Sequence, residues 1–125
     1  MSTESPRGLP EVTEPLLVEV KIADHSVEMS LAIPHELIYF RGHFPALAVL
    51  PGVVQIDWVM LYGRRYLKIG EATVRTLQVK FRKIIRPRDY LTLTIVHQPA
   101  RAQIQFTYAN MAGSLSSGRI GLETP

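Results

Sequence analysis

The segment from Pro51 to Gly70 constrains the fold most strongly, because its apolar side chains cover almost every direction around a helical wheel. This pattern predicts a helix that is buried in the core of a protein. Pro51 suits the first turn of such a helix, and Gly70 can adopt the left-handed conformation that commonly ends one. Three basic residues in the last turns complement the negative end of the helix dipole: Arg64, Arg65 and Lys68.

The residues on either side of this segment alternate between apolar and polar side chains, which predicts β-strands. One buried helix and several strands in 125 residues fit a single α+β domain, with a curved antiparallel sheet wrapped around the helix. Such a sheet keeps an open edge, so we expect pairing with a second subunit. We place the domain at 15–125 and a flexible tail at 1–14, where Ser, Thr, Glu, Pro and Gly predominate. The expected strands are Leu16–Lys21, Val27–Ile33, Val74–Ile85, 91–95, 104–108 and Leu115–Leu122, of which the last four form a meander.

The composition excludes several kinds of chemistry. The chain has no cysteine, which rules out disulfides, thiolate metal sites and a cysteine nucleophile. Its four histidines show no paired ligand spacing, so we expect neither a metal nor another cofactor. The N-terminus lacks the pattern of a secretion signal, and no apolar run reaches the roughly 18 residues of a membrane span. We therefore expect a cytoplasmic protein.

Asp57 and Gln55 are the only polar residues in the most apolar run of the predicted helix. An ionised carboxylate in a buried helix costs free energy unless it is paired or solvated. One interpretation is that backbone groups or a nearby loop satisfy Asp57, which is the commoner fate of such a residue. The other is that Asp57 faces a pocket. Burial among Val53, Val54 and Trp58 would then favour the neutral carboxyl that an acid catalyst needs.

His43 lies in a predicted loop, between Gly42 and the pair Phe44-Pro45. Glycine permits unusual backbone angles, and the residue before a proline has a restricted backbone. Loops of this kind often direct a side chain into a site. A histidine on the surface, or one bonded to a backbone carbonyl, is the alternative.

Together these two residues belong to the run RGHFPALAVLPGVVQIDWV, which resembles the signature of 3-hydroxyacyl-acyl carrier protein dehydratases of the FabA/FabZ type. That signature has G-H-F, then P-G at the start of the central helix, then an acid fourteen residues after the histidine. In this chain His43 and Asp57 are fourteen residues apart, with Pro51-Gly52 between them. A weaker resemblance extends over residues 16–122 and implies the hot-dog fold.

The resemblance implies an enzyme that removes water from 3-hydroxyacyl thioesters on acyl carrier protein and gives trans-2-enoyl thioesters, in fatty acid or polyene-type biosynthesis. His43 would be the base that removes the α-proton, and Asp57 the acid that protonates the departing hydroxyl. The backbone N–H of Gly52 would bind the thioester carbonyl, unless this glycine serves only the close packing at a helix start. Phe44 and Trp58 would contact the substrate. Each site in this family combines the histidine of one subunit with the acid of the other, which implies a homodimer or a heterodimer with a related hot-dog subunit.

The chain departs from the family pattern at three positions. Ala46 and Ala48 stand where Gly and Pro are usual, and Leu61 stands where Gln is frequent. That glutamine lies one turn beyond the acid and can orient it, so Leu61 leaves Asp57 without this partner. A different pocket shape and a division of labour with a related subunit are both compatible with these changes. The run PGVVQIDW is most similar to dehydratase components of aryl polyene clusters.

Nine of the fourteen basic residues lie between Arg64 and Arg88, against the single acid Glu71. One interpretation is a solvated strand face, and the other is a landing site for acyl carrier protein, an acidic partner. Nucleic-acid binding is disfavoured, because only Phe81 and Tyr90 supply aromatic rings among these charges. An acyl-thioesterase on the same fold, or a non-catalytic hot-dog subunit that supports a partner, are the alternative functions.

Overall fold

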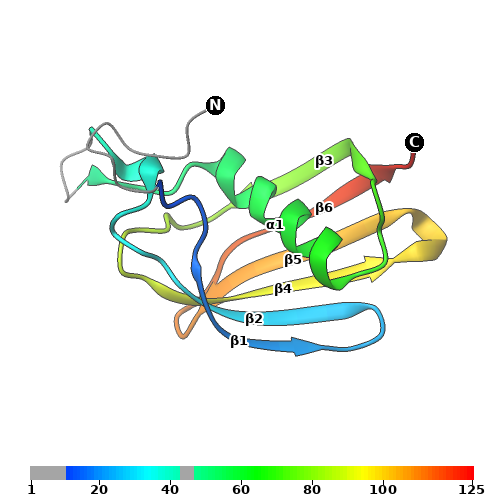
Figure 1. Cartoon of the computed structure of the whole chain (residues 1–125), viewed down its shortest axis with the longest axis horizontal. Helices are drawn as coiled ribbons and strands as arrows, with labels where there is room; N and C mark the ends of the chain where they lie inside the picture. The colour runs from blue at the N-terminus through cyan, green and yellow to red at the C-terminus, as the bar shows by residue number, and fades with distance from the viewer. Residues whose placement is uncertain (1–10, 43–46) are drawn as a thin grey trace.

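A computed structural model describes residues 11–42 and 47–125 of the chain (Figure 1). The elements in chain order are β1 (Leu16–Ile22), β2 (Ser26–Ala32), the 3-10 helix η1 (Ile38–Phe40), α1 (Gly52–Tyr66), β3 (Thr73–Phe81), β4 (Tyr90–Gln98), the 3-10 helix η3 (Pro99–Arg101), β5 (Gln103–Asn110) and β6 (Gly113–Glu123).

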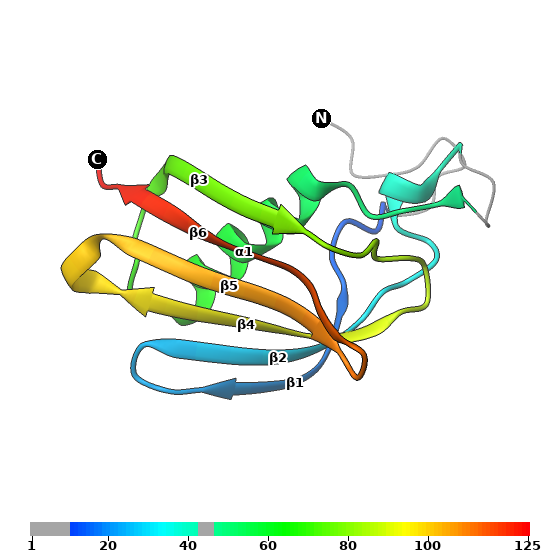
Figure 2. The ribbon, with the colours of Figure 1, turned by 180° about the vertical axis from the view of Figure 1, so that it is seen from behind.

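All six strands form one antiparallel sheet in the order β1-β2-β4-β5-β6-β3. Figures 1 and 2 show this sheet from its two sides, with α1 lying across one face of it. A single long helix against a curved antiparallel sheet is the hot-dog arrangement, so the predicted fold class is confirmed.

The predicted meander of four strands is only partly correct. β4, β5 and β6 are consecutive neighbours, whereas β3 pairs with β6 at the far edge of the sheet and β4 pairs with β2. β3 also ends at Phe81, four residues earlier than Ile85. The alternation of side chains indicates which face of a sheet a residue occupies, but it does not indicate which strand lies beside it. The pattern therefore could not predict which strand lies beside β3.

The core lies between α1 and the face of the sheet that α1 covers. Val59 and Tyr62 of α1 are fully buried, as are Leu93, Ile104 and Ile120 of the sheet. Burying one large apolar side chain completely stabilises a fold by about 1.5–3 kcal/mol. This layer therefore supplies much of the driving force that holds the helix to the sheet.

α1 also has an outer side, so the prediction of a helix buried in every direction is wrong for the single chain. Val53 is 69% exposed, and Asp57 is exposed as well. The helix ends at Tyr66, because Leu67 leaves the helical conformation with φ −118° and ψ 158°. Gly70 does have a positive φ of 58°, but it lies in the turn that leads to β3 and does not cap the helix.

The segment before β1 packs against α1. Val12 forms a parallel bridge with the chain just before η1. The indole N–H of Trp58 donates to the carbonyl of Thr13 at 3.0 Å, and the hydroxyl of Tyr62 donates to the carboxylate of Glu14 at 3.2 Å. The predicted tail therefore does not extend to residue 14, because buried aromatic N–H and O–H groups of the helix need these acceptors.

Within residues 11–42 and 47–125, no helix is long and apolar enough to cross a membrane.

Candidate active site

Three residues that the sequence assigns to the active site lie in the described part of the chain: Gly52, Asp57 and Trp58, all in α1. The other two, His43 and Phe44, lie outside the described residues, and their roles stay predictions. The side chain of Asp57 is exposed in the single chain. The expected burial of this carboxyl among apolar neighbours is therefore wrong for one chain alone.

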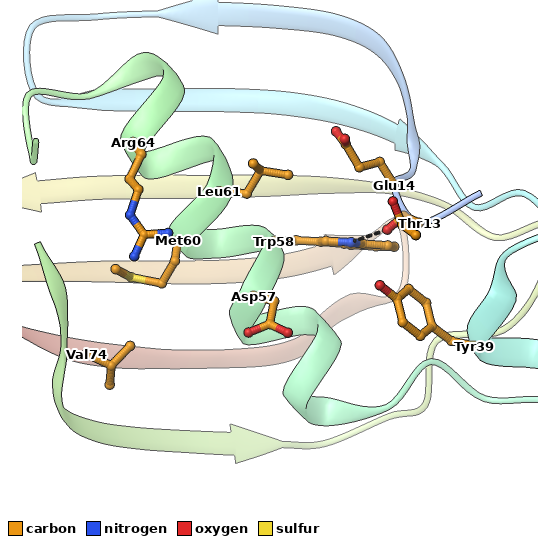
Figure 3. Close-up of a pocket in the computed structure, with 9 residues that line it drawn as sticks. All are labelled: Thr13, Glu14, Tyr39, Asp57, Trp58, Met60, Leu61, Arg64 and Val74. Carbon is orange, nitrogen blue, oxygen red and sulfur yellow. Dashed lines mark hydrogen bonds between the residues drawn. The ribbon is translucent and has the colours of Figure 1, made fainter. Parts of the chain in front are cut away.

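Asp57 lines a pocket of about 500 Å³ on the outer side of α1 (Figure 3). Small-molecule sites commonly have volumes of about 300–1,000 Å³. The walls come from the segment before β1, from η1, from α1 and from the start of β3. The lining residues are Thr13, Glu14, Tyr39, Asp57, Trp58, Met60, Leu61, Arg64 and Val74.

Along α1, the pocket follows a stripe formed by Asp57, Leu61 and Arg64, which share one face of the helix at spacings of four and three residues. Leu61 lies one turn beyond the acid and has no polar group that could orient it. Arg64 lies about 10 Å along the helix axis from Asp57. Its guanidinium donates to the carbonyl of Ala72 at 3.0 Å, which fixes it to the turn before β3.

Trp58 forms an apolar wall of this pocket. Its side chain is only 2% exposed, and its indole N–H is already bonded to the Thr13 carbonyl (Figure 3). The ring is thus held in one orientation by a hydrogen bond at its far edge. Contact between Trp58 and a substrate stays a prediction, and any such contact would be made through the ring surface.

Tyr39 is a pocket residue that the sequence reasoning missed. It belongs to η1, four residues before His43, and its hydroxyl points toward α1 (Figure 3). Burial, followed by the negative charges of Asp57 and Glu14, raises the pKa of the Tyr39 phenol above its ordinary value. The phenol therefore stays protonated at neutral pH and can donate a hydrogen bond. The only signal in the sequence was the hydroxyl of Tyr39, a polar group within the apolar stretch 37–40 that precedes His43.

Gly52 begins α1 and lines a second pocket, of about 440 Å³, between α1 and β3. A side chain at this position would place its Cβ 2.6 Å from Cζ of Phe81, so the ring of Phe81 packs directly on the glycine. The first amides of a helix have no acceptor within the helix, which leaves the N–H of Gly52 free of an intrahelical bond. Both predicted reasons for a glycine, close packing and an available N–H, fit this position.

Gly52 and Asp57 point in different directions. Five residues of an α-helix turn the chain through about 500°, so the two residues lie about 140° apart around the axis. They line different pockets, one beside β3 and the other beside η1. A single chain therefore does not bring the predicted carbonyl donor and the predicted acid together.

Gln55, the second polar residue of the apolar run, lies on the opposite side of the helix from Asp57 and is only 3% exposed. Its amide oxygen accepts a hydrogen bond from Ser116 at 2.7 Å, and its amide nitrogen donates to the carbonyl of Leu50 at 3.5 Å. Its backbone carbonyl accepts from Tyr108 at 2.6 Å. These bonds tie the first turns of α1 to β5 and β6, which makes Gln55 a structural residue.

The basic stretch is divided between two ends of the molecule. Arg64 lies near the C-terminal end of α1, whereas Arg82 and Lys83 line a pocket of about 300 Å³ with Gly52 at the N-terminal end. The length of the helix separates these ends by about 20 Å. Arg82 donates to the hydroxyl of Ser117 at 2.9 Å. Arg82 and Lys83 adjoin Gly52, whereas Arg64 lines the pocket of Asp57 and Trp58. Among the described residues, no three His, Asp or Glu side chains form a group that could hold a metal ion.

Known proteins are similar to this chain in sequence and in fold. The ApeI-like family, described as ApeI dehydratase, matches residues 19–119. A 3-hydroxyacyl-[acyl-carrier-protein] dehydratase FabZ from Oenococcus oeni is 30% identical over 118 residues, covering 86% of this chain and 85% of the relative.

Two solved structures extend this similarity to three dimensions. The dehydratase heterocomplex ApeI:P from Xenorhabdus doucetiae has a TM-score of 0.81 at 32% identity, covering 89% of this chain and 99% of that chain. An uncharacterized protein from Erwinia carotovora subsp. atroseptica has a TM-score of 0.76 at 31% identity, covering 88% and 96%.

The antiparallel sheet against one long helix, together with the similarity to the dehydratase heterocomplex and to FabZ, places the chain in the class of hot-dog dehydratases. Within this class, the match over residues 19–119 spans most of the chain. The chain belongs to the ApeI-like dehydratase family.

Proposed function

We propose that the chain is a cytoplasmic 3-hydroxyacyl-[acyl-carrier-protein] dehydratase that gives trans-2-enoyl thioesters in fatty acid or aryl polyene biosynthesis. The observation that carries this proposal is the position of Asp57, which lines a pocket of about 500 Å³ on the open side of α1. Asp57 also occupies the acid position of the motif that begins at Gly42. Membership of a dehydratase family supports the reaction type.

In the proposed reaction, the neutral imidazole of His43 removes a proton from the carbon next to the thioester carbonyl. The negative charge that develops on the carbonyl oxygen is stabilised by the N–H of Gly52 and by the positive end of the helix dipole. The C–O bond at the third carbon breaks, and the carboxyl of Asp57 donates a proton to the departing hydroxyl, which leaves as water. A proton then passes from the His43 imidazolium to the Asp57 carboxylate, which restores both groups.

A site shared between two subunits supplies the arrangement that one chain lacks. The carbonyl donor acts at the first carbon of the substrate and the acid at the third, only two bonds away, yet Gly52 and Asp57 point about 140° apart within a chain. A partner that brings its own Gly52 and His43 to this Asp57 would complete the site. The partner would also cover Asp57 and favour its neutral form.

The surface proposed for that partner is the edge strand β3 together with the groove beside α1. Within the described sheet β3 pairs with β6 alone, so its other side keeps unpaired backbone groups. Val53, Leu77 and Phe81 line the groove and are 69%, 48% and 53% exposed. Exposed apolar side chains gathered at an open strand are typical of a subunit interface. The heterocomplex of the Xenorhabdus relative supports a hot-dog partner, either a second copy or a related subunit.

The substrate is proposed to arrive on acyl carrier protein at the end of α1 where Gly52 lies. Arg82 and Lys83 stand beside Gly52 and would attract the acidic carrier. The FabZ relative carries the acyl carrier protein in its name, which supports this choice of carrier.

Purified protein tested with 3-hydroxyacyl, 2-enoyl and saturated acyl thioesters would test this function. A dehydratase interconverts the first two without releasing free thiol. Release of thiol from the saturated substrate would show a thioesterase and overturn the proposal. A protein that is inactive alone, and that raises the activity of an added hot-dog partner equally well as Asp57→Asn, would be a supporting subunit, which contradicts a catalytic role for Asp57.

A further inference from the structure

Asp57 needs a neighbour that holds its carboxyl in one orientation, because an exposed carboxylate rotates freely and an acid catalyst must meet its substrate at a fixed angle. Leu61, one turn further along α1, has no donor for this purpose. Other side chains that line the pocket carry hydrogen-bond donors that could orient Asp57 instead.

Four side chains that line the pocket carry polar hydrogens: Thr13, Tyr39, Trp58 and Arg64. Thr13 lies beyond the far edge of the Trp58 ring as seen from Asp57 (Figure 3), and Trp58 and Arg64 each donate to another acceptor. The indole N–H of Trp58 donates to the Thr13 carbonyl, at the far edge of the ring. The guanidinium of Arg64 donates to Ala72, and Arg64 lies about 10 Å along the helix from Asp57. The hydroxyl of Tyr39 is different, because it points from η1 toward the side of α1 that carries Asp57 (Figure 3).

Hydrogen bonds hold the backbone of η1 on both sides of Tyr39. The N–H of Ile38 donates to the carbonyl of Val12 at 2.9 Å, and the N–H of Arg41 donates to the carbonyl of Ile38 at 3.2 Å. Phe40, the next residue, is buried in the core. A side chain on such a support can act as an orienting group, whereas one on a loose loop cannot.

We infer that Tyr39 is a positioning residue for Asp57: in the completed site its phenol donates a hydrogen bond to the Asp57 carboxyl and replaces the amide that Leu61 lacks. The inference rests on the proposed function for its effect on turnover. Burial, followed by the negative charges of Asp57 and Glu14, raises the pKa of the phenol, so the donor is present throughout the neutral range. The contact lies within one chain, which distinguishes it from the proposed pairing of His43 and Asp57 across two chains.

The first experiment compares Tyr39→Phe with Tyr90→Phe. Both remove one hydroxyl and keep the ring, but Tyr90 is exposed at the start of β4. For Tyr39→Phe we expect kcat to fall about tenfold or more, with KM changed less than about twofold. Tyr90→Phe should retain normal values. Unchanged kcat in Tyr39→Phe would overturn the inference.

The second experiment separates an effect on Asp57 from an effect on the neighbouring His43 loop. Mixed dimers of His43→Ala and Asp57→Asn chains have one intact site, which takes Asp57 from the His43→Ala chain. Adding Tyr39→Phe to that chain should lower the recovered activity about tenfold or more. Adding it to the Asp57→Asn chain should leave the recovered activity unchanged. Equal losses from both placements would show that Tyr39 supports the fold or the His43 loop, and would overturn the inference.

The third experiment does not depend on activity. Chains with ¹³C at the tyrosine Cζ are titrated by NMR, and the Tyr39 signal is assigned from its absence in Tyr39→Phe. Asp57→Asn removes a negative charge that raises the pKa of Tyr39, so this pKa should fall in the variant. Asp24→Asn, in the exposed turn between β1 and β2, should leave it unchanged. An unchanged Tyr39 pKa in Asp57→Asn would overturn the inference. A fall in that pKa, in a wild-type protein without dehydratase activity, would overturn the proposed function alone.

Discussion

Gln55 and Asp57 are two residues apart in α1, and both interrupt the same apolar run, yet their surroundings are opposite. Gln55 faces the sheet, where Ser116 and the carbonyl of Leu50 bond to its side chain in the core. Asp57 faces outward and lines a pocket. A rotation of about 200° around the helix separates a residue that holds the fold from one that is available for chemistry.

This difference shows what a polar residue in an apolar helix requires. A buried amide is tolerated when its hydrogen-bonding groups are satisfied, and the Gln55 amide meets this condition within one chain. A carboxylate costs more to bury, and here it lies at the surface of the single chain. The side of α1 that is exposed in the single chain is therefore the side that carries the proposed function.

The largest effect is expected on turnover, from variants that test the outward side of α1. His43→Ala and Asp57→Asn should each lower turnover at least about a hundredfold, because a general acid or base typically contributes 10²–10⁴. The folded state should persist, since Asp57 is exposed in the single chain. Turnover is measured with a 3-hydroxyacyl thioester, and folding by circular dichroism. Near-normal turnover in either folded variant would remove the mechanism, and unfolding of Asp57→Asn would make it a structural residue like Gln55.

The next prediction asks whether the outward side is completed by another chain. The His43→Ala and Asp57→Asn chains are unfolded, mixed in equal amounts and refolded together. With random pairing, half of the dimers are mixed and one of their two sites is intact, so about a quarter of wild-type activity should return. Failure to recover activity, when mass measurement shows that mixed dimers are present, would show that both groups come from the same chain.

A smaller effect is expected on the inward side, in stability rather than in chemistry. Gln55→Leu leaves the buried hydroxyl of Ser116 without its acceptor and should lower the free energy of unfolding by about 1–3 kcal/mol. The double variant Gln55→Leu/Ser116→Ala removes both partners and should recover part of this loss. Urea denaturation of the wild type, the two single variants and the double variant measures the coupling. Strictly additive losses would show that the bond between Gln55 and Ser116 contributes little.

Sequence reasoning predicted the architecture because periodicity is a local signal. The helical segment, the strands and the fold class followed from which residues alternate and which do not. The position of β3 beside β6 did not follow, since strand neighbours depend on how the chain crosses the sheet. The end of α1 at Tyr66 also differed, because the extended backbone of Leu67 has no distinct signature in its side chain.

The candidate site was predicted only in part, and from a resemblance rather than from periodicity. The spacing of fourteen residues identified Asp57 through a resemblance, and the structure places it in a pocket. The spacing could not show that Asp57 is exposed and Gln55 is buried, since both occupy one apolar run. Tyr39 was missed because its closeness to Asp57 depends on how η1 folds back onto α1, eighteen residues away in sequence.

The smallest effect is expected on KM for a carrier-bound substrate. It compares the two ends of the molecule rather than the two sides of the helix. Lys83→Glu/Arg88→Glu reverses two charges in the segment after β3, where Lys83 lies beside Gly52 and Ile85 bonds to Leu50. Lys68→Glu/Arg101→Glu makes the same charge change beyond the other end of α1. Because long-range attraction acts on encounter, the first variant should raise KM for a carrier-bound substrate by up to about tenfold at low salt. It should spare a short pantetheine thioester, which has no acidic protein to attract. The control pair should change neither value. Equal effects of both charge-reversed pairs, or equal effects on both substrates, would show that the carrier does not dock at the Gly52 end.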